Sequence, residues 1–139
     1  MRVCFPDGTA IQALSLRERK AHDSERDYGL YLDRSWAPTW DACVIAWEDF
    51  GLPADNEEAA HSIIDAFRRA KAGEAVEIGC IGGLGRTGTV LACMAVLSGV
   101  PRSDAVDWVR ANYHRNAVET EEQAAWVLWF AEQTASDGR

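Results

Sequence analysis

The chain has 139 residues, the size of one domain, and 47% of them are apolar, which is enough for a buried core. Its formal net charge of -8 argues against a nucleic-acid partner, which would require a basic surface, and against binding to an anionic membrane. We therefore expect one soluble domain over residues 1–139 that binds neither nucleic acid nor membrane.

Neither a leader peptide nor a metal site is predicted. Residues 1–10 place Pro6, Asp7 and Gly8 where a signal peptide needs an apolar run. The longest uninterrupted apolar run, residues 90–97, is much shorter than the roughly 20 residues that span a bilayer. The four cysteines lack C-x-x-C spacing and the three histidines are scattered. We expect reduced thiols, no metal, no cofactor and a cytoplasmic location.

The N-terminal part of the chain predicts short strands and one irregular segment. Residues 1–14 predict two strands around a turn at Pro6-Asp7-Gly8. Residues 15–35 are polar, with charges of both signs, and we expect a surface loop with some helix there. Residues 43–47 are apolar throughout and predict a buried strand.

Helix signals are clear in the middle of the chain. A helix begins after Asp55, which can cap it, with Glu58 at the capping-box position, and it ends at Gly73. Residues 75–79 predict another short strand. Residues 87–97 are almost wholly apolar and predict a helix that is buried all round.

Two more helices follow, and the order of elements predicts the fold. Ser103 caps a helix that runs to about Tyr113, and Thr120 begins the last helix. Strands that alternate with helices are typical of an α/β protein with a partly parallel sheet covered by helices. Ligands in such proteins bind beyond the carboxyl ends of the strands, where the loops 48–55 and 80–86 would lie.

The segment 80–88, Cys-Ile-Gly-Gly-Leu-Gly-Arg-Thr-Gly, is the strongest functional motif. Its three glycines before the arginine let the backbone curl so that amide groups point inward around an anion. The segment then enters the N-terminus of a helix, which also favours an anion. The amides expected to bind phosphate are those of Ile81, Gly82, Gly83, Leu84, Gly85 and Arg86.

The side chains of this segment complete a site for phosphate chemistry. Arg86 can hold two phosphate oxygens with its planar fork. The same positive surroundings favour the thiolate form of Cys80, which is the nucleophilic form. Thr87 can donate a hydroxyl hydrogen bond to that sulfur and stabilise it as a leaving group.

Cys-x5-Arg-Thr-Gly resembles the signature loop of the protein tyrosine and dual-specificity phosphatases, and the Gly-Gly-Leu-Gly-Arg variant is similar to that of the small kinase-associated phosphatases. Residues 47–53, Trp-Glu-Asp-Phe-Gly-Leu-Pro, resemble the mobile acid loop of tyrosine phosphatases, which implies that Asp49 is the general acid. Residues 119–123 resemble the later glutamine loop, which implies that Gln123 positions water.

The resemblance implies a phosphatase-like α/β fold, in which helices flank a mostly parallel sheet of four to five strands. It also implies hydrolysis of phosphotyrosine through a cysteinyl-phosphate on Cys80, and it leaves open whether phosphoserine and phosphothreonine are further substrates. Substrates would be phosphorylated proteins or small phosphomonoesters, and we expect a monomer.

Two departures from the family pattern leave other functions open. Gly79 replaces the histidine that usually precedes the nucleophile, and Glu48 replaces the usual proline beside the acid. A module that binds phosphorylated partners without hydrolysing them is therefore a second hypothesis. An arsenate reductase or sulfurtransferase, which also places a cysteine in an oxyanion loop, is a third. The aspartate loop would have no purpose in such an enzyme.

Several candidate residues also have purely structural interpretations. Aspartate is common in turns, so Asp49 is also interpreted as a turn residue before Gly51. Threonine is common at helix N-termini, so Thr87 is also interpreted as a helix cap. Thr120 and Gln123 have capping-box spacing, so that the glutamine amide would bind only backbone. Cys43 is interpreted as a small buried hydrophobic residue rather than as a redox partner of the nucleophile.

Overall fold

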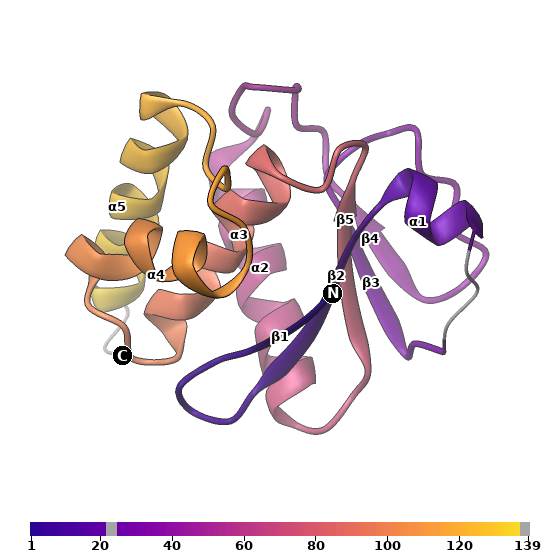
Figure 1. Ribbon diagram of the computed structural model, residues 1–139, viewed down its shortest axis with the longest axis horizontal. Coiled ribbons are helices and arrows are strands. Elements are labelled where there is room, and N and C mark those ends of the chain that lie inside the picture. Colours follow the sequence, from indigo (N-terminus) through magenta and orange to yellow (C-terminus); the bar gives the residue numbers. More distant parts are fainter. Residues whose placement is uncertain (22–24, 137–139) are drawn as a thin grey trace.

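The computed structural model describes residues 1–21 and 25–136. Five strands form a single sheet in the order β1-β2-β5-β3-β4 (Figure 1). The strands are β1 (Arg2–Cys4), β2 (Ala10–Ser15), β3 (Tyr28–Tyr31), β4 (Ala42–Val44) and β5 (Val76–Cys80). Only the β1–β2 pair is antiparallel among these strands. The predicted α/β fold with a mostly parallel sheet is confirmed.

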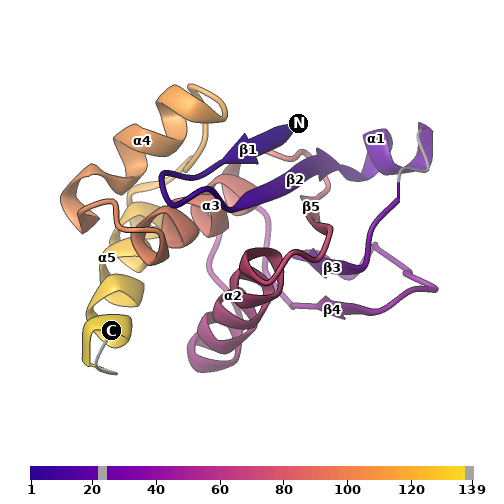
Figure 2. The same cartoon turned by 90° about the horizontal axis from the view of Figure 1, so that it is seen from below.

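The helices are α1 (Leu16–Ala21), α2 (Asn56–Lys71), α3 (Gly85–Leu97), α4 (Ala105–Asn112) and α5 (Glu121–Ser136), with a short 3₁₀ turn, η1 (Arg102–Asp104), before α4. Figure 2 shows α2 to α5 on one side of the sheet and α1 on the other. The carboxyl ends of the four parallel strands therefore meet at one edge, where the loops that follow β4 and β5 begin.

The prediction for residues 15–35 is wrong in one respect. Residues 16–21 do form a helix, but β3 is a fully buried inner strand between β5 and β4. Only four apolar or small residues form it, and charged residues stand close by on both sides, so local sequence resembles a loop. Pairing with its two neighbours decides the outcome. The part of the prediction that covers residues 22–24 lies outside the described residues.

The predicted strand over residues 43–47 is displaced. The strand occupies residues 42–44 at the edge of the sheet, and Val44 is 36% exposed. The buried residues of this run, Ile45 and Trp47, follow the strand and belong to the start of the next loop. An edge strand is buried on fewer sides than an inner strand. The apolar residues of this segment therefore do not coincide with the residues that form the strand.

The predicted helices are present with small shifts. The Asp55 carboxylate accepts a hydrogen bond from the Glu58 amide at 3.0 Å, so the predicted cap of α2 is confirmed. Gly73 follows this helix with a φ of 103°, in the left-handed region that glycine tolerates. Helix α3 is buried on nearly all sides, as predicted, but begins at Gly85 and thus includes Arg86 in its first turn.

The other face of the sheet carries a buried polar cluster. The carboxylate of Glu77 on β5 is 1% exposed and accepts hydrogen bonds from the Arg19 Nε at 3.0 Å and from the Tyr31 hydroxyl. Tyr31 also stacks on Trp36, with 4.2 Å between the ring centroids. This cluster fixes α1 and the segment after β3 against the sheet, and that segment borders the candidate site.

Candidate functional site

Cys80 is the last residue of β5, and its sulfur accepts two hydrogen bonds. The Gly83 amide donates to Sγ at 3.1 Å and the Thr87 hydroxyl donates at 3.0 Å. Donors directed at a sulfur favour its anionic form, which is the nucleophilic one. Gly83 has a φ of 77°, so the curl that turns its amide toward the sulfur needs a glycine.

The loop after Cys80 leads directly into the first turn of α3 (Figure 1). Partial positive charge at a helix N-terminus favours an anion at this point. Among the predicted phosphate-binding residues, Ile81 and Gly82 are exposed, Leu84 is half-buried and Gly85 is buried. The loop thus covers Cys80, which is 2% exposed. The beginning of the loop itself borders solvent.

Arg86 is the most firmly anchored residue of the site. Its side chain is 2% exposed, and Nη1 donates to the Leu32 carbonyl at 3.1 Å, to Asp33 Oδ2 at 2.7 Å and to the Trp47 carbonyl at 2.8 Å. These acceptors follow β3 and β4. The guanidinium therefore ties the loop that follows Cys80 to the segments that follow β3 and β4.

The other edge of the same guanidinium is nearly free. Nε is buried and has no hydrogen-bond partner among residues 1–21 and 25–136. Nη2 lies 3.6 Å from Asp49 Oδ1. Nε and Nη2 are the two donors that bind an oxyanion side by side. A buried donor without an acceptor is costly, so this edge is arranged for a ligand that supplies oxygen atoms.

Asp49 lies at the tip of a loop whose base is buried. The Trp47 side chain is 4% exposed, donates from Nε1 to the Gly51 carbonyl at 2.8 Å and packs on Trp126. Asp49 is 63% exposed beyond this base, and the following residue, Phe50, has a φ of 59°. Left-handed backbone at a residue other than glycine is unfavourable and is characteristic of functional loops. We call residues 47–53 the acid loop.

Gln123 is completely buried, and its amide is occupied. Oε1 accepts from the Glu119 amide at 2.8 Å and from the Thr120 amide at 3.3 Å, while Nε2 donates to the Gly51 carbonyl at 3.1 Å. Its own backbone amide donates to the Thr120 hydroxyl at 3.0 Å. The capping-box interpretation of Thr120 and Gln123 is therefore confirmed. In addition, the Gln123 side-chain amide donates to the backbone of the acid loop.

Three residues beside the site were not found by sequence reasoning: Asp33, Tyr113 and Glu119. Burial disfavours the ionised form of Asp33, but hydrogen bonds from Ser35 and Arg86 prevail and lower its pKa. Asp33 follows β3, the strand that was not predicted, so nothing in the sequence placed it at this edge of the sheet. The Tyr113 hydroxyl donates to the Gly83 carbonyl.

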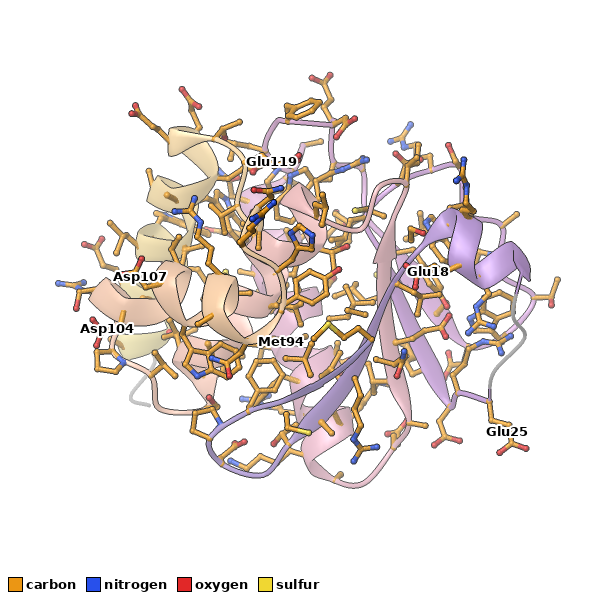
Figure 3. The ribbon with its side chains drawn as sticks, viewed as in Figure 1. Glu18, Glu25, Met94, Asp104, Asp107 and Glu119 are labelled. Carbon is orange, nitrogen blue, oxygen red and sulfur yellow. The ribbon has the colours of Figure 1, made fainter. Side chains whose placement is uncertain are left out.

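Glu119 approaches the beginning of α3 from the connection between α4 and α5 (Figure 3). A side chain at Gly85 would collide with its carboxylate. Partial burial and the neighbouring charge of Asp49 raise the pKa of Glu119, whereas Arg86 and a hydrogen bond from the Gly85 backbone act in the opposite direction. Two acidic side chains therefore flank the free edge of the guanidinium.

Trp36 gives a physical reason for the unusual glycine before the nucleophile. A Cβ at Gly79 would lie 2.5 Å from Trp36 Cζ2 and 3.1 Å from the Leu14 carbonyl oxygen. The indole, stacked on Tyr31, thus occupies the space that a side chain at position 79 would need. Gly79 is a consequence of this packing.

Apolar side chains and a shallow groove surround the site. Ile81, Phe50 and Leu52 are 48%, 60% and 38% exposed. A groove of about 460 Å³ runs beside the acid loop between Asp33 and Leu52. A second hollow, of about 880 Å³, lies at the opposite edge of the sheet, and Cys80 lines neither of the two. In the described part of the chain, no group of acidic, histidine and cysteine side chains could hold a metal ion, and no helix could cross a bilayer.

Packing at Gly79 can be tested with a matched pair of variants. We expect Gly79→Ala to lower the free energy of unfolding by about 1–3 kcal/mol, because the new methyl group overlaps the Trp36 ring. Gly82→Ala is the control, since a Cβ at Gly82 would have no neighbour within 4 Å. Urea unfolding followed by circular dichroism measures both. Equal losses in the two variants would contradict the packing argument.

Comparison with known proteins agrees with this geometry. The family model that describes protein-tyrosine phosphatase sequences matches residues 14–129 of the chain. Two uncharacterised proteins of Methanocaldococcus jannaschii are 36% identical to the chain over 110 residues, which is 71% of the chain and 72% and 67% of the two relatives.

Solved phosphatases share the fold at low sequence identity. Tk-PTP, in a G95A mutant form, superposes with a TM-score of 0.68 at 23% identity, over 96% of both chains. PTPMT1 superposes with a TM-score of 0.71 at 13% identity, over 99% of this chain and 98% of its own. Because the family model covers most of its length, the chain belongs to the protein-tyrosine phosphatase family.

Proposed function

We propose that the chain is a cysteine-dependent phosphatase that hydrolyses phosphotyrosine through a cysteinyl-phosphate, with phosphoserine and phosphothreonine as the alternative substrates to be compared. The observation that carries this proposal is the free, buried edge of the Arg86 guanidinium in the same loop as the Cys80 thiol. A phosphate dianion supplies the oxygen atoms that this edge lacks, and the N-terminus of α3 adds further positive potential.

The first step transfers the phosphoryl group to sulfur. The Cys80 thiolate attacks phosphorus, an S–P bond forms, and the bond from phosphorus to the leaving oxygen breaks. Asp49 donates its proton to that oxygen. Loop amides and Arg86 hold the three equatorial oxygens while charge builds up on them.

The second step releases phosphate. Asp49, now ionised, takes a proton from water as the water oxygen attacks phosphorus, and the S–P bond breaks. The hydrogen bonds from Gly83 and Thr87 then stabilise the departing thiolate. Gln123 acts in this scheme as a positioning residue, because its amide is held by backbone and by the acid loop.

The rim of the site favours an aromatic phosphoester. Exposed Phe50 and Ile81 offer apolar surface on two sides of the loop, against which a phenyl ring can pack. A phosphoinositide is the alternative ligand, since PTPMT1, whose fold this chain shares, was crystallised in complex with PI(5)P. Glu48, Asp49 and Glu119 near the same rim would repel additional phosphate groups, which argues for a singly phosphorylated substrate.

The roles of Cys80 and Asp49 can be tested by three substitutions. We expect Cys80→Ser to abolish hydrolysis of p-nitrophenyl phosphate, because serine cannot supply a thiolate. Asp49→Asn should lower kcat by about 10²–10⁴ with a small effect on KM, as expected for loss of a general acid. Glu48→Gln, which removes a charge from the exposed neighbour in the same loop, is the control and should keep kcat near that of the wild type.

Two results would contradict this assignment. Equal and negligible rates for the wild type and Cys80→Ser would indicate a module that binds phosphate without hydrolysing it. Full phosphatase activity in Asp49→Asn would exclude the acid and reopen the reductase or sulfurtransferase hypothesis. Hydrolysis of matched peptides that carry phosphotyrosine, phosphoserine or phosphothreonine then measures the specificity.

The raised pKa of Glu119 predicts a pH dependence of substrate binding. This carboxyl remains protonated to higher pH than an ordinary glutamate, so its negative charge beside the site appears as the pH rises. We expect Glu119→Gln to lower KM roughly two- to fivefold at about pH 8 and to have little effect at about pH 4. The ratio of the two KM values at each pH cancels ionisation of the substrate itself. A ratio that does not change with pH would contradict the prediction.

A further inference from the structure

We call residues 80–86 the phosphate loop. Two of its carbonyl groups accept hydrogen bonds from other parts of the fold. The Leu16 amide, at the beginning of α1, donates a hydrogen bond to the Ile81 carbonyl oxygen at 3.4 Å. The hydroxyl of Tyr113, at the end of α4, donates to the Gly83 carbonyl. The second contact is the stronger candidate for a functional role, because it is made by a side chain and can be removed without changing the backbone.

The contact at Gly83 fixes the direction of the Leu84 amide and anchors the residue whose own amide donates to the Cys80 sulfur. In a trans peptide the carbonyl and the following N–H point in opposite directions, so the Leu84 amide points away from Tyr113. Nothing in residues 1–21 and 25–136 accepts a hydrogen bond from that amide. The preceding amide, that of Gly83 itself, donates to the Cys80 sulfur at 3.1 Å. One side chain thus orients the peptide next to the nucleophile.

Tyr113 keeps its phenolic proton to higher pH than an ordinary tyrosine and is therefore a hydrogen-bond donor at neutral pH. Burial raises the pKa of its phenol, and negative charge at Cys80 and at Glu18 raises it further. A neutral hydroxyl that donates to a carbonyl also polarises the attached peptide, which strengthens the N–H on its other side.

We propose that Tyr113 is a positioning residue of the phosphate loop, which directs the Leu84 amide toward a bound phosphate and keeps the Gly83 amide on the Cys80 sulfur. This inference rests on the proposed function only in that the anion is a substrate phosphate. The alternative is that Tyr113 serves packing alone, since its ring also contacts the main core.

The variant Tyr113→Phe separates the two, because it keeps the ring and removes the hydroxyl. We expect the dissociation constant for inorganic phosphate to rise about two- to tenfold, which corresponds to the loss of one hydrogen bond. In NMR titrations the Leu84 amide proton of the wild type should move downfield with phosphate, and this shift should be reduced in the variant. Alkylation of Cys80 by iodoacetamide at a fixed pH should also be slower in the variant.

Tyr28→Phe is the matched control. Tyr28 is a buried tyrosine at the amino end of β3, the end opposite the site, and burial raises the pKa of its phenol to about 12. We expect this variant to bind phosphate and to react with iodoacetamide as the wild type does. Thermal unfolding of both variants reports any general loss of stability.

The outcomes distinguish this inference from the proposed function. Unchanged phosphate affinity, an unchanged Leu84 shift and an unchanged alkylation profile in Tyr113→Phe would overturn the positioning role, even if the wild type hydrolyses phosphoesters. Equal effects of the two tyrosine variants would also overturn it. If the wild type hydrolyses nothing but Tyr113→Phe alone weakens phosphate binding, the inference stands and the hydrolytic function is wrong.

Discussion

A single buried guanidinium joins the parts of the chain that make the site. Nη1 of Arg86 donates to the Leu32 and Trp47 carbonyls and to the Asp33 carboxylate. These residues belong to loops that come together only when β3 and β4 have paired. A buried charge without such acceptors would be strongly unfavourable. The fold thus supplies acceptors for one edge of the guanidinium and leaves the Nε edge without one, and in the proposed function a bound phosphate supplies the missing acceptor.

The surroundings of this guanidinium show how packing and chemistry constrain each other. The Glu119 carboxylate lies where a side chain at Gly85 would project, and the Trp36 ring and the Leu14 carbonyl fill the space beside Gly79. Gln123 is used to brace the acid loop at the Gly51 carbonyl. The shape of the site thus depends on packing around it as well as on the Cys80 loop itself.

The sequence predicts the elements whose signals are local and misses those that depend on pairing. The cap at Asp55 and the path from β5 through the glycine-rich loop into α3 could be predicted, because turn chemistry and helix signals lie within a few residues of each other. Strand β3 could not, because its burial comes from its neighbours in the sheet. Asp33 was missed for the same reason. Tyr113 was missed because its partner lies thirty positions away in the sequence.

A crystal structure of the protein with inorganic phosphate tests the central claim most directly. The account predicts phosphate oxygens within hydrogen-bond distance of both Nε and Nη2 of Arg86, about 2.7–2.9 Å away, with Nη1 still bound to its protein acceptors. Phosphate bound elsewhere, or bound in the loop while Nε remains without an acceptor, would contradict it.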